Sequence, residues 1–201
     1  NNIFAQSSPP LIVFGLIADT QYADCESGKT RFYRNSLGKL HESIDYFNNQ
    51  KVQFTVNLGD IIDRDQKDLD SVLICLKHLN KKIFHTTGNH DYKGITDNKG
   101  VSSRQLQWLD NLLKKSEKKN RNVLIFCHHP LYPRSQFTAL NNMEILDVIN
   151  RYNCVKAIFS GHHHSGAFGY FDHIPCNTVE GMIETPDKNS FGIVRIYKDR
   201  I

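Results

Sequence analysis

The chain has 201 residues, and its 25 basic and 21 acidic side chains give a formal net charge of +4. Hydrophobic residues make up 39% of the chain, including 12 Phe and 8 Tyr, so a core can form and a largely disordered chain is excluded. The length fits one large domain or two small ones.

Composition also disfavours several classes of partner. The longest apolar run, at 11–18, is far below the roughly 20 residues that a membrane span requires, so no membrane segment is expected. A charge of +4 with ten histidines is too small to indicate a nucleic-acid partner. The five cysteines are odd in number and include no CxxC pair, which argues against a disulfide framework and a thiolate zinc site.

Residues 1–10 read NNIFAQSSPP, a polar leader without an initiating methionine. The leader indicates either a trimmed or processed terminus or the remnant of a secretory signal whose apolar region is absent. Cytoplasmic and exported locations therefore both stay open.

Strand-like and helix-like segments alternate through the first half of the chain. A continuous apolar run at 11–18 predicts a buried strand, and an apolar stripe of helical period predicts a helix at 30–50. A second strand at 53–58, a helix at 69–79 and a third strand at 82–87 follow. Polar residues close these strands: Asp19, then Gly59 and Asp60, then Gly88, Asn89, His90 and Asp91.

The alternation continues after a polar loop at 92–100. A capping-box pattern predicts a helix at 102–116, which is followed by a strand at 122–127. A helix at 142–151 and a strand at 155–160 come next. The residues that close these two strands are His128, His129 and Pro130, and Gly161, His162, His163 and His164.

Two terminal strands, at 177–183 and 191–197, are predicted to form a hairpin at the edge of a sheet, around a turn of Pro, Asp and Asn. Alternating strands and helices followed by terminal strands indicate an α/β domain.

The polar residues that close the five core strands predict a functional site. Ligands of α/β sheets collect beyond the carboxyl ends of the strands. One aspartate at such an end is usually a turn residue or a helix cap. Five strand ends that all carry Asp, Asn or His side chains together indicate a shared site. The candidate residues are Asp19, Asp60, Asn89, His90, His128, His162 and His164.

Five motifs built on these residues resemble the signature of the calcineurin-like metallophosphoesterases, whose usual form is DxH, GDxxDR, GNHD/E, HxP and GHxH. In this chain they read IADTQ, GDIIDR, GNHD, CHHP and GHHH. The resemblance implies one domain over 11–201, folded as an α/β/β/α sandwich of two mixed sheets flanked by helices.

One departure from the signature points to a narrower group. Gln21 stands where the family usually has histidine. That change, with the segments FGLIADTQYAD, RFYRNSLGKL and EGMIETPDKNSFGIVRIYKDR, resembles the manganese-dependent ADP-ribose/CDP-alcohol diphosphatases.

The resemblance implies a centre of two divalent metal ions bridged by Asp60. Asp19, Gln21, Asp60 and His164 would hold one ion, and Asp60, Asn89, His128 and His162 the other. Carboxylate, carboxamide and imidazole ligands without sulfur suit manganese or iron, and zinc or magnesium less distinctively. Because a neutral glutamine replaces a good nitrogen donor, we expect the first position to be looser and filled only when manganese is plentiful.

The resemblance also implies catalytic and substrate-binding residues. His90 would act as general acid on the leaving oxygen, with Asp91 orienting its imidazole. Asp63 is favoured as a residue that orients a neighbour, while His129 and His163 are expected to be loop residues rather than ligands. Candidate substrate-binding residues are Arg31, Arg34 and Arg64, with Tyr33, Glu180, Glu184 and Thr185 also near that site.

The implied reaction is hydrolysis of the pyrophosphate of a nucleoside diphosphate-linked compound, such as ADP-ribose or a CDP-alcohol, by a metal-bridging hydroxide. Two alternatives stay open: a phosphomonoesterase or cyclic-nucleotide phosphodiesterase on the same scaffold, and a non-catalytic module that binds metal and phosphate. A nuclease is less favoured, because no basic stripe with interleaved aromatic residues is visible.

The connection between Asp91 and Val101 is short. Members of the family place a further core strand and substrate-covering loops there. The chain is therefore either a short form, or residues between Gly100 and Val101 are missing from it.

Overall fold

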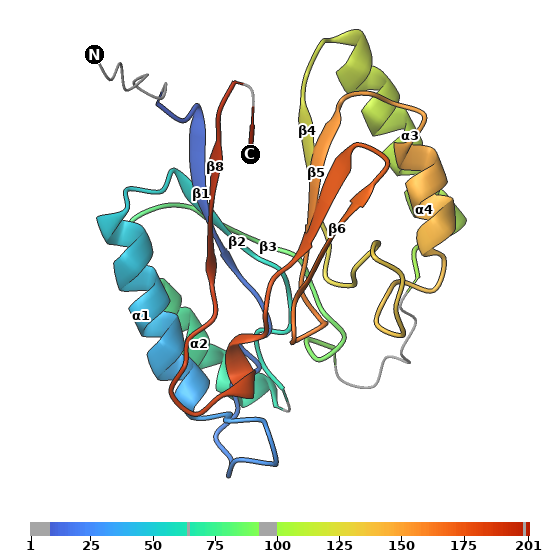
Figure 1. Ribbon diagram of the computed structural model, residues 1–201. Coiled ribbons are helices and arrows are strands. Elements are labelled where there is room, and N and C mark those ends of the chain that lie inside the picture. The colour runs from blue at the N-terminus through green and yellow to red at the C-terminus, as the bar shows by residue number, and fades with distance from the viewer. Residues whose placement is uncertain (1–8, 64, 93–99, 199) are drawn as a thin grey trace, which may run out of the picture.

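Two four-stranded sheets pack face to face between two pairs of helices in the computed structural model, which describes residues 9–63, 65–92, 100–198 and 200–201 (Figure 1). The α/β/β/α sandwich of two mixed sheets is therefore confirmed. Arg64, the loop residues 93–99 and the leader residues 1–8 lie outside the described residues.

The first sheet is parallel except for its last strand. β1 pairs in parallel with β2 and β2 with β3, while β8 runs antiparallel along the other edge of β1. Helices α1 (Asn35–Asn49) and α2 (Leu69–Leu76) pack on its outer face through a shared core. In spatial order its strands are β3 (Ile83–His85), β2 (Phe54–Asn57), β1 (Ile12–Ile17) and β8 (Gly192–Ile196).

The second sheet has the same plan. β4 and β5 are parallel, as are β5 and β7, and β6 runs antiparallel to β7. Helices α3 (Ser103–Lys118) and α4 (Asn142–Ile149) pack on its outer face. In spatial order its strands are β4 (Val123–Phe126), β5 (Val155–Ser160), β7 (Ile174–Thr178) and β6 (Ala167–Phe171).

An aromatic cluster joins the two sheets. The fully buried ring of Phe14 on β1 stacks on Phe54 at a centroid distance of 4.9 Å. Its edges meet Phe126 of β4 and Phe159 of β5, each at 5.7 Å. Because such pairs stabilise beyond the area they bury, this cluster fixes one sheet against the other.

The alternation of strands and helices is as predicted, but two local predictions are wrong. The helix expected at 30–50 begins only at Asn35, because the side chain of Tyr33 packs in a separate small core with Ala23 and Ile183. The capping box on Ser102 and Gln105 is present as predicted, with both of its hydrogen bonds.

The predicted terminal hairpin is also wrong. The hairpin that forms is β6–β7, which turns at Asp172 with a left-handed φ of 53°. Of the segment expected as the first hairpin strand, 177–183, the first two residues end β7 and the last two begin the short 3₁₀ helix η2 (Met182–Glu184). The chain then returns to the first sheet, where β8 pairs with β1.

Composition gave expectations about the cysteines and about membrane-spanning segments, and the structure describes both. All five cysteines are free, three of them buried and two partly buried. Of the helices in the described ranges, none has both the length and the apolar character needed to cross a membrane.

Candidate metal centre

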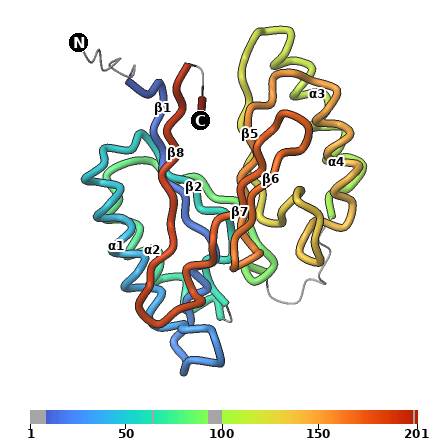
Figure 2. Tube along the Cα trace, viewed as in Figure 1, coloured from blue at the N-terminus to red at the C-terminus, as the bar shows by residue number. Residues whose placement is uncertain are grey.

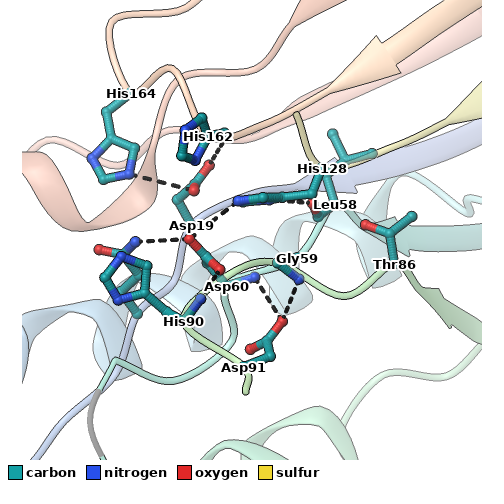
Figure 3. Close-up of polar contacts among 12 residues, drawn as sticks. Asp19, Leu58, Gly59, Asp60, Thr86, His90, Asp91, His128, His162 and His164 are labelled. Atoms are coloured by element: carbon teal, nitrogen blue, oxygen red, sulfur yellow. Dashed lines mark hydrogen bonds and ion pairs between the residues drawn. The ribbon is translucent and has the colours of Figure 1, made fainter. Parts of the chain in front are cut away.

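The carboxyl ends of strands from both sheets meet in one region of the molecule (Figure 2). The candidate residues gather there (Figure 3). Ligand atoms of Asp19, Asp60 and His128 lie within 4.8 Å of one another, and all three residues are buried. The backbone amide of His162 donates to Asp19 Oδ2 at 2.9 Å, which ties the end of β5 to that of β1. The two sheets therefore contribute to one cluster.

Four of the seven predicted ligand residues have left-handed backbone conformations. Such φ values are uncommon outside glycine and cost about 1–3 kcal/mol each, so they persist where surrounding structure enforces them. Each turns the chain sharply after its strand and directs the side chain into the cluster. The φ angles are 53° at Asp19, 40° at Gln21, 55° at Asp60 and 65° at His162.

Asp60 lies at the centre of the cluster. Its Oδ2 accepts from Gln21 Nε2 at 3.0 Å and lies 3.2 Å from His128 Nε2, while its Oδ1 accepts from the backbone amide of His90 at 2.8 Å. Burial alone would raise the pKa of Asp60, but His128 and His90 lower it overall. A charged carboxylate with contacts on both sides is suited to bridge two cations.

The imidazoles of His128 and His164 each have one ring nitrogen held by a neighbouring residue. His128 Nδ1 lies 2.9 Å from the Leu58 carbonyl, so it carries the proton and leaves Nε2 directed at Asp60. His164 Nδ1 contacts Glu184 Oε1 at 2.5 Å, and its Nε2 lies 3.4 Å from Asp19 Oδ1. Partners of this kind hold metal-binding histidines in the tautomer that a metal requires.

Two buried carboxamide oxygens test whether the residues fit a metal centre. Among the described residues, neither Gln21 Oε1 nor Asn89 Oδ1 has a hydrogen-bond partner. A buried polar atom left without one costs about 1–3 kcal/mol. A divalent cation would satisfy both oxygens, and the surrounding carboxylates and imidazoles complete a donor set for manganese or iron. The residues fit the implied centre, and the role of each as a ligand stays a prediction.

The sequence is similar to those of known proteins. The calcineurin-like phosphoesterase family matches residues 12–108. A protein of Oryza sativa named manganese-dependent ADP-ribose/CDP-alcohol diphosphatase is 26% identical, over 99% of this chain and 92% of its own length. The human protein of that name is also 26% identical, over 98% of this chain and 90% of its own. The chain is similar to the calcineurin-like phosphoesterases over residues 12–108, just under half of its length.

The fold of this chain is also found in a solved structure. A crystal structure of a dimetal phosphatase from Danio rerio, 24% identical, matches with a TM-score of 0.86 over 94% of each chain. The alignment with the rice protein spans 296 positions, although this chain has 201 residues. About a third of those positions therefore have no counterpart in this chain.

Two glycines let the loops after β2 and β3 approach each other. Gly59 has a φ of 103°, and a Cβ there would lie 2.8 Å from His128 Nδ1. A Cβ on Gly88 would lie 2.0 Å from Asp60 Oδ1, which is closer than any real contact. Backbone therefore touches the central carboxylate directly.

Replacing Gly88 with alanine should weaken manganese binding by about 10- to 100-fold, the equivalent of the roughly 1–3 kcal/mol that overpacking costs. The added methyl group would displace Asp60 from its position between its neighbours. Isothermal titration with Mn²⁺ measures the effect. Gly38→Ala is the matched control, because nothing lies within 4 Å of its Cβ position on α1. Equal affinity in the two variants would contradict the prediction.

The expected partner of His90 is wrong. His90 Nδ1 pairs with Asp63 Oδ1 at 3.0 Å, and this hydrogen bond raises the pKa of His90 although burial opposes it. Asp91 instead accepts from the backbone amides of Asp60, Ile61 and Gly88 at 2.7–2.9 Å. Asp91 therefore fixes the two glycine loops, and Asp63, predicted to orient a neighbour, orients the imidazole.

Replacing Asp63 with asparagine should lower kcat by about 10- to 100-fold, because a charge-assisted hydrogen bond worth about 1.5–3 kcal/mol is lost. Manganese content should stay unchanged, since Asp63 contacts His90 and Arg31. A pH–rate profile should show the acidic group of the reaction titrating at lower pH. Asp70→Asn on α2 is the control, and an unshifted profile would contradict the assignment.

A cavity of about 580 Å³, here called the polar cavity, opens beside the cluster. Six of its lining residues are Gln21, Arg31, His90, Phe137, His164 and Glu184. The buried Lys39 shapes its wall, because its Nζ donates to the carbonyl of Met182 at 2.8 Å and to that of Thr185. Those bonds hold the segment that carries Glu184.

The three arginines expected to bind substrate differ in their positions. Arg31 lines the polar cavity, with Nη1 3.5 Å from Asp63 Oδ1. Arg34 is not brought to this cavity: it pairs with Asp24 at 2.7 Å and Glu26 at 2.5 Å on the surface. Arg64 lies outside the described residues. Glu180, Glu184 and Thr185, also expected near the site, line the cavity, whereas Tyr33 does not.

Two aromatic features were missed. The ring of His129, expected to be only a loop residue, lies 4.2 Å from that of His162, and nitrogens of both lie within 4.8 Å of one on His128. Phe137 stacks on His163 at 4.4 Å and lines the polar cavity. The doubled histidines of CHHP and GHHH were a signal for the first, whereas no motif marks Phe137.

Proposed function

We propose that this phosphoesterase hydrolyses the diphosphate bond of nucleoside diphosphate-linked sugars and alcohols, such as ADP-ribose and CDP-alcohols, with two manganese ions. The observation that carries the proposal is the meeting of the buried ligand cluster and the oriented His90 at one polar cavity. The substrate class follows from the names of relatives that match over nearly the whole chain.

The chain's own residues supply orientation and a proton. Bound metal ions would polarise the phosphoryl oxygens and lower the pKa of water. A bond forms from the water oxygen to one phosphorus, and the bond from that phosphorus to the bridging oxygen breaks. His90, whose pKa is raised by its hydrogen bond to Asp63, would give its proton to the departing oxygen. The products are a nucleoside monophosphate and a phosphorylated sugar or alcohol.

The polar cavity fits one half of such a substrate. Arg31 offers a guanidinium to a phosphate oxygen, and Glu184 and Thr185 supply oxygen acceptors suited to ribose hydroxyls. The ring of Phe137 provides a face on which a base can stack.

A manganese-supplemented hydrolysis screen tests the proposal. ADP-ribose and CDP-choline should each yield a nucleoside monophosphate, and a chelator should abolish the reaction. Turnover of bis(p-nitrophenyl) phosphate or a cyclic nucleotide, without turnover of either diphosphate, would assign a phosphodiesterase instead. A protein that binds manganese but turns over none of these would be a binding module.

Replacing Gln21 with histidine should tighten manganese binding at the weaker of the two positions by about tenfold, because imidazole is a better donor than carboxamide. Wild-type protein should titrate with two separate affinities, and the variant should bring them closer. Electron paramagnetic resonance of Mn²⁺ during titration separates free from bound ions. Unchanged affinities would contradict the expectation that glutamine loosens the first position. Gln66→His, exposed in the short 3₁₀ helix before α2, is the control.

The short connection before α3 carries a second proposal. We propose that the positions of the relatives without a counterpart correspond to a segment that would lie between Gly100 and Val101. Either the protein is a short form without this segment, or the segment is missing from the sequence. The longer alignments support it. Intact mass of the protein from its source separates the two explanations, because a short form has a mass near 23.1 kDa over these residues.

A further inference from the structure

A row of polar residues on helix α1 holds the 182–189 segment, which runs from η2 to the turn before β8. The side-chain amide of Asn35 donates to a backbone carbonyl of this segment at 2.7 Å. Asn189 Nδ2 donates to Glu42 Oε2 at 3.0 Å and to the carbonyl of Lys39 at 2.7 Å. Because Asn35, Lys39 and Glu42 follow one another at intervals of four and three residues, they share one face of the helix. Helix α1 therefore presents a polar face to this segment, beside the apolar face that packs on the sheet.

Lys39 is the buried member of this row. Its Nζ donates to the carbonyl of Met182 at 2.8 Å, to the carbonyl of Thr185, and to Thr185 Oγ1 at 3.3 Å. The three N–H groups of an ammonium thus meet three oxygens. Burial lowers the pKa of Lys39, whereas the charges of Asp187 and Glu184 raise it. Because a buried charge is costly unless it is paired and hydrogen-bonded, lysine is suited to this place only while the segment is in position.

The hydrogen bonds of Lys39 lie on both sides of Glu184. One accepting carbonyl is two residues before Glu184, and the other belongs to the residue after it. Glu184 Oε1 contacts His164 Nδ1 at 2.5 Å. The other nitrogen of that ring lies 3.4 Å from Asp19 Oδ1 (Figure 3). Direct contacts therefore connect Lys39 with the imidazole of His164 through a single carboxylate.

From these contacts, and resting on the manganese centre of the proposed function, we propose that Lys39 is a positioning residue that sets how tightly the first metal position binds its ion. It acts through Glu184, which holds His164, a predicted ligand of that position. A metal-binding imidazole is better oriented and more basic when a carboxylate holds its second nitrogen. Lys39 fixes this carboxylate from outside the metal centre, because its hydrogen bonds go to the residues that flank Glu184.

Titration of the whole protein with Mn²⁺, followed by electron paramagnetic resonance, gives a readout that does not depend on turnover. Lys39→Met keeps an unbranched side chain and removes its three donors. The variant should bind manganese about tenfold more weakly at the first position, because loss of an outer partner of a metal-binding histidine typically costs about 10- to 100-fold in affinity. Affinity at the second position should stay the same. Lys77→Met, which replaces an exposed lysine at the end of α2, is the matched control.

A double-mutant cycle separates positioning from general stabilisation of the fold. His164→Ala should by itself weaken the first position. Lys39→Met should then cause no further loss of affinity, because the imidazole through which it acts is absent. A lysine that only stabilises the fold would weaken both positions, or would weaken the first position equally with and without His164. Either of these results would overturn the proposal.

Asn35→Ala replaces Lys39→Met if that variant does not fold by circular dichroism. Asn35 is exposed and gives one hydrogen bond to the 182–189 segment, so its loss should leave the fold intact. The first position should then bind manganese about two- to fivefold more weakly. Unchanged affinity at that position would overturn the proposal.

The same measurements distinguish failure of this proposal from failure of the proposed function. If Lys39→Met binds manganese as wild type does while His164→Ala loses the first position, the role of Lys39 is refuted and the metal centre stands. If Lys39→Met weakens only the first position but ADP-ribose and CDP-choline are not cleaved, the role of Lys39 stands and the diphosphatase fails. Two unchanged affinities in His164→Ala would refute both the ligand role of His164 and the action of Lys39 through it.

Discussion

Replacing Asp60 with asparagine should leave the protein without bound manganese and lower its activity by about 10³-fold or more, because a stabilisation of several kcal/mol is lost. The side chain is fully buried and is the one that contacts Gln21, His128 and the His90 amide. Asparagine keeps the shape but removes the charge that would face both cations. Elemental analysis of dialysed protein measures the metal content.

The exposed Asp147→Asn on α4 is the control for this variant. Both proteins should fold, because the carboxamide oxygen of the new asparagine could still accept the hydrogen bond from the His90 amide. Two equivalents of manganese retained by Asp60→Asn would refute a bridging role.

Replacing His90 with alanine should lower kcat by about 10²- to 10⁴-fold while leaving manganese content unchanged. The contact that ties this residue to Asp60 is made by its backbone amide, which alanine retains. The loss should be smaller for a p-nitrophenyl ester, whose leaving group needs no proton. Rates with both leaving groups, measured beside metal content, test the assignment.

The surface variant His41→Ala should behave as wild type. If His90→Ala loses equal activity with good and poor leaving groups, His90 acts in some way other than protonation. An unchanged rate would remove it from the reaction.

Much of the site was predictable because each functional side chain follows a buried strand by one or a few residues. Asp19 and Asp60 come directly after apolar runs, so one local pattern predicted both the strand and the position of its closing residue. Parallel pairing then brought those ends together.

Contacts between loops were not predictable in the same way. Asp91 directly follows His90 in the chain, whereas Asp63 lies in the loop after β2, and the packing of the two loops decides which carboxylate meets the imidazole. Arg31 and Arg34 are three residues apart, yet nearby Asp24 and Glu26 draw only the second to the surface. Such choices are tertiary and leave no periodic signal.

The pairing of the last strand, β8, could not be predicted for a related reason. The pattern at 191–197 predicted a strand, and β8 lies within it. Its partner is β1, about 180 residues earlier in the chain. The alternation of side chains indicates which face of a strand is buried, but not which edge of a sheet the strand joins. A turn-rich segment nearby favoured the wrong, local partner.

The aromatic contacts around Phe14 matter for the metal centre, because the predicted metal ligands come from both sheets. Asp19, Asp60 and Asn89 follow strands of one sheet, whereas His128 and His162 follow strands of the other. Bound ions would therefore act as a cross-link between two separate layers, closing the end of a sandwich whose middle is held by stacked rings. We expect the two sheets to shift against each other only when the ions are released. A substitution in the aromatic cluster should therefore change activity although the cluster is distant from the substrate.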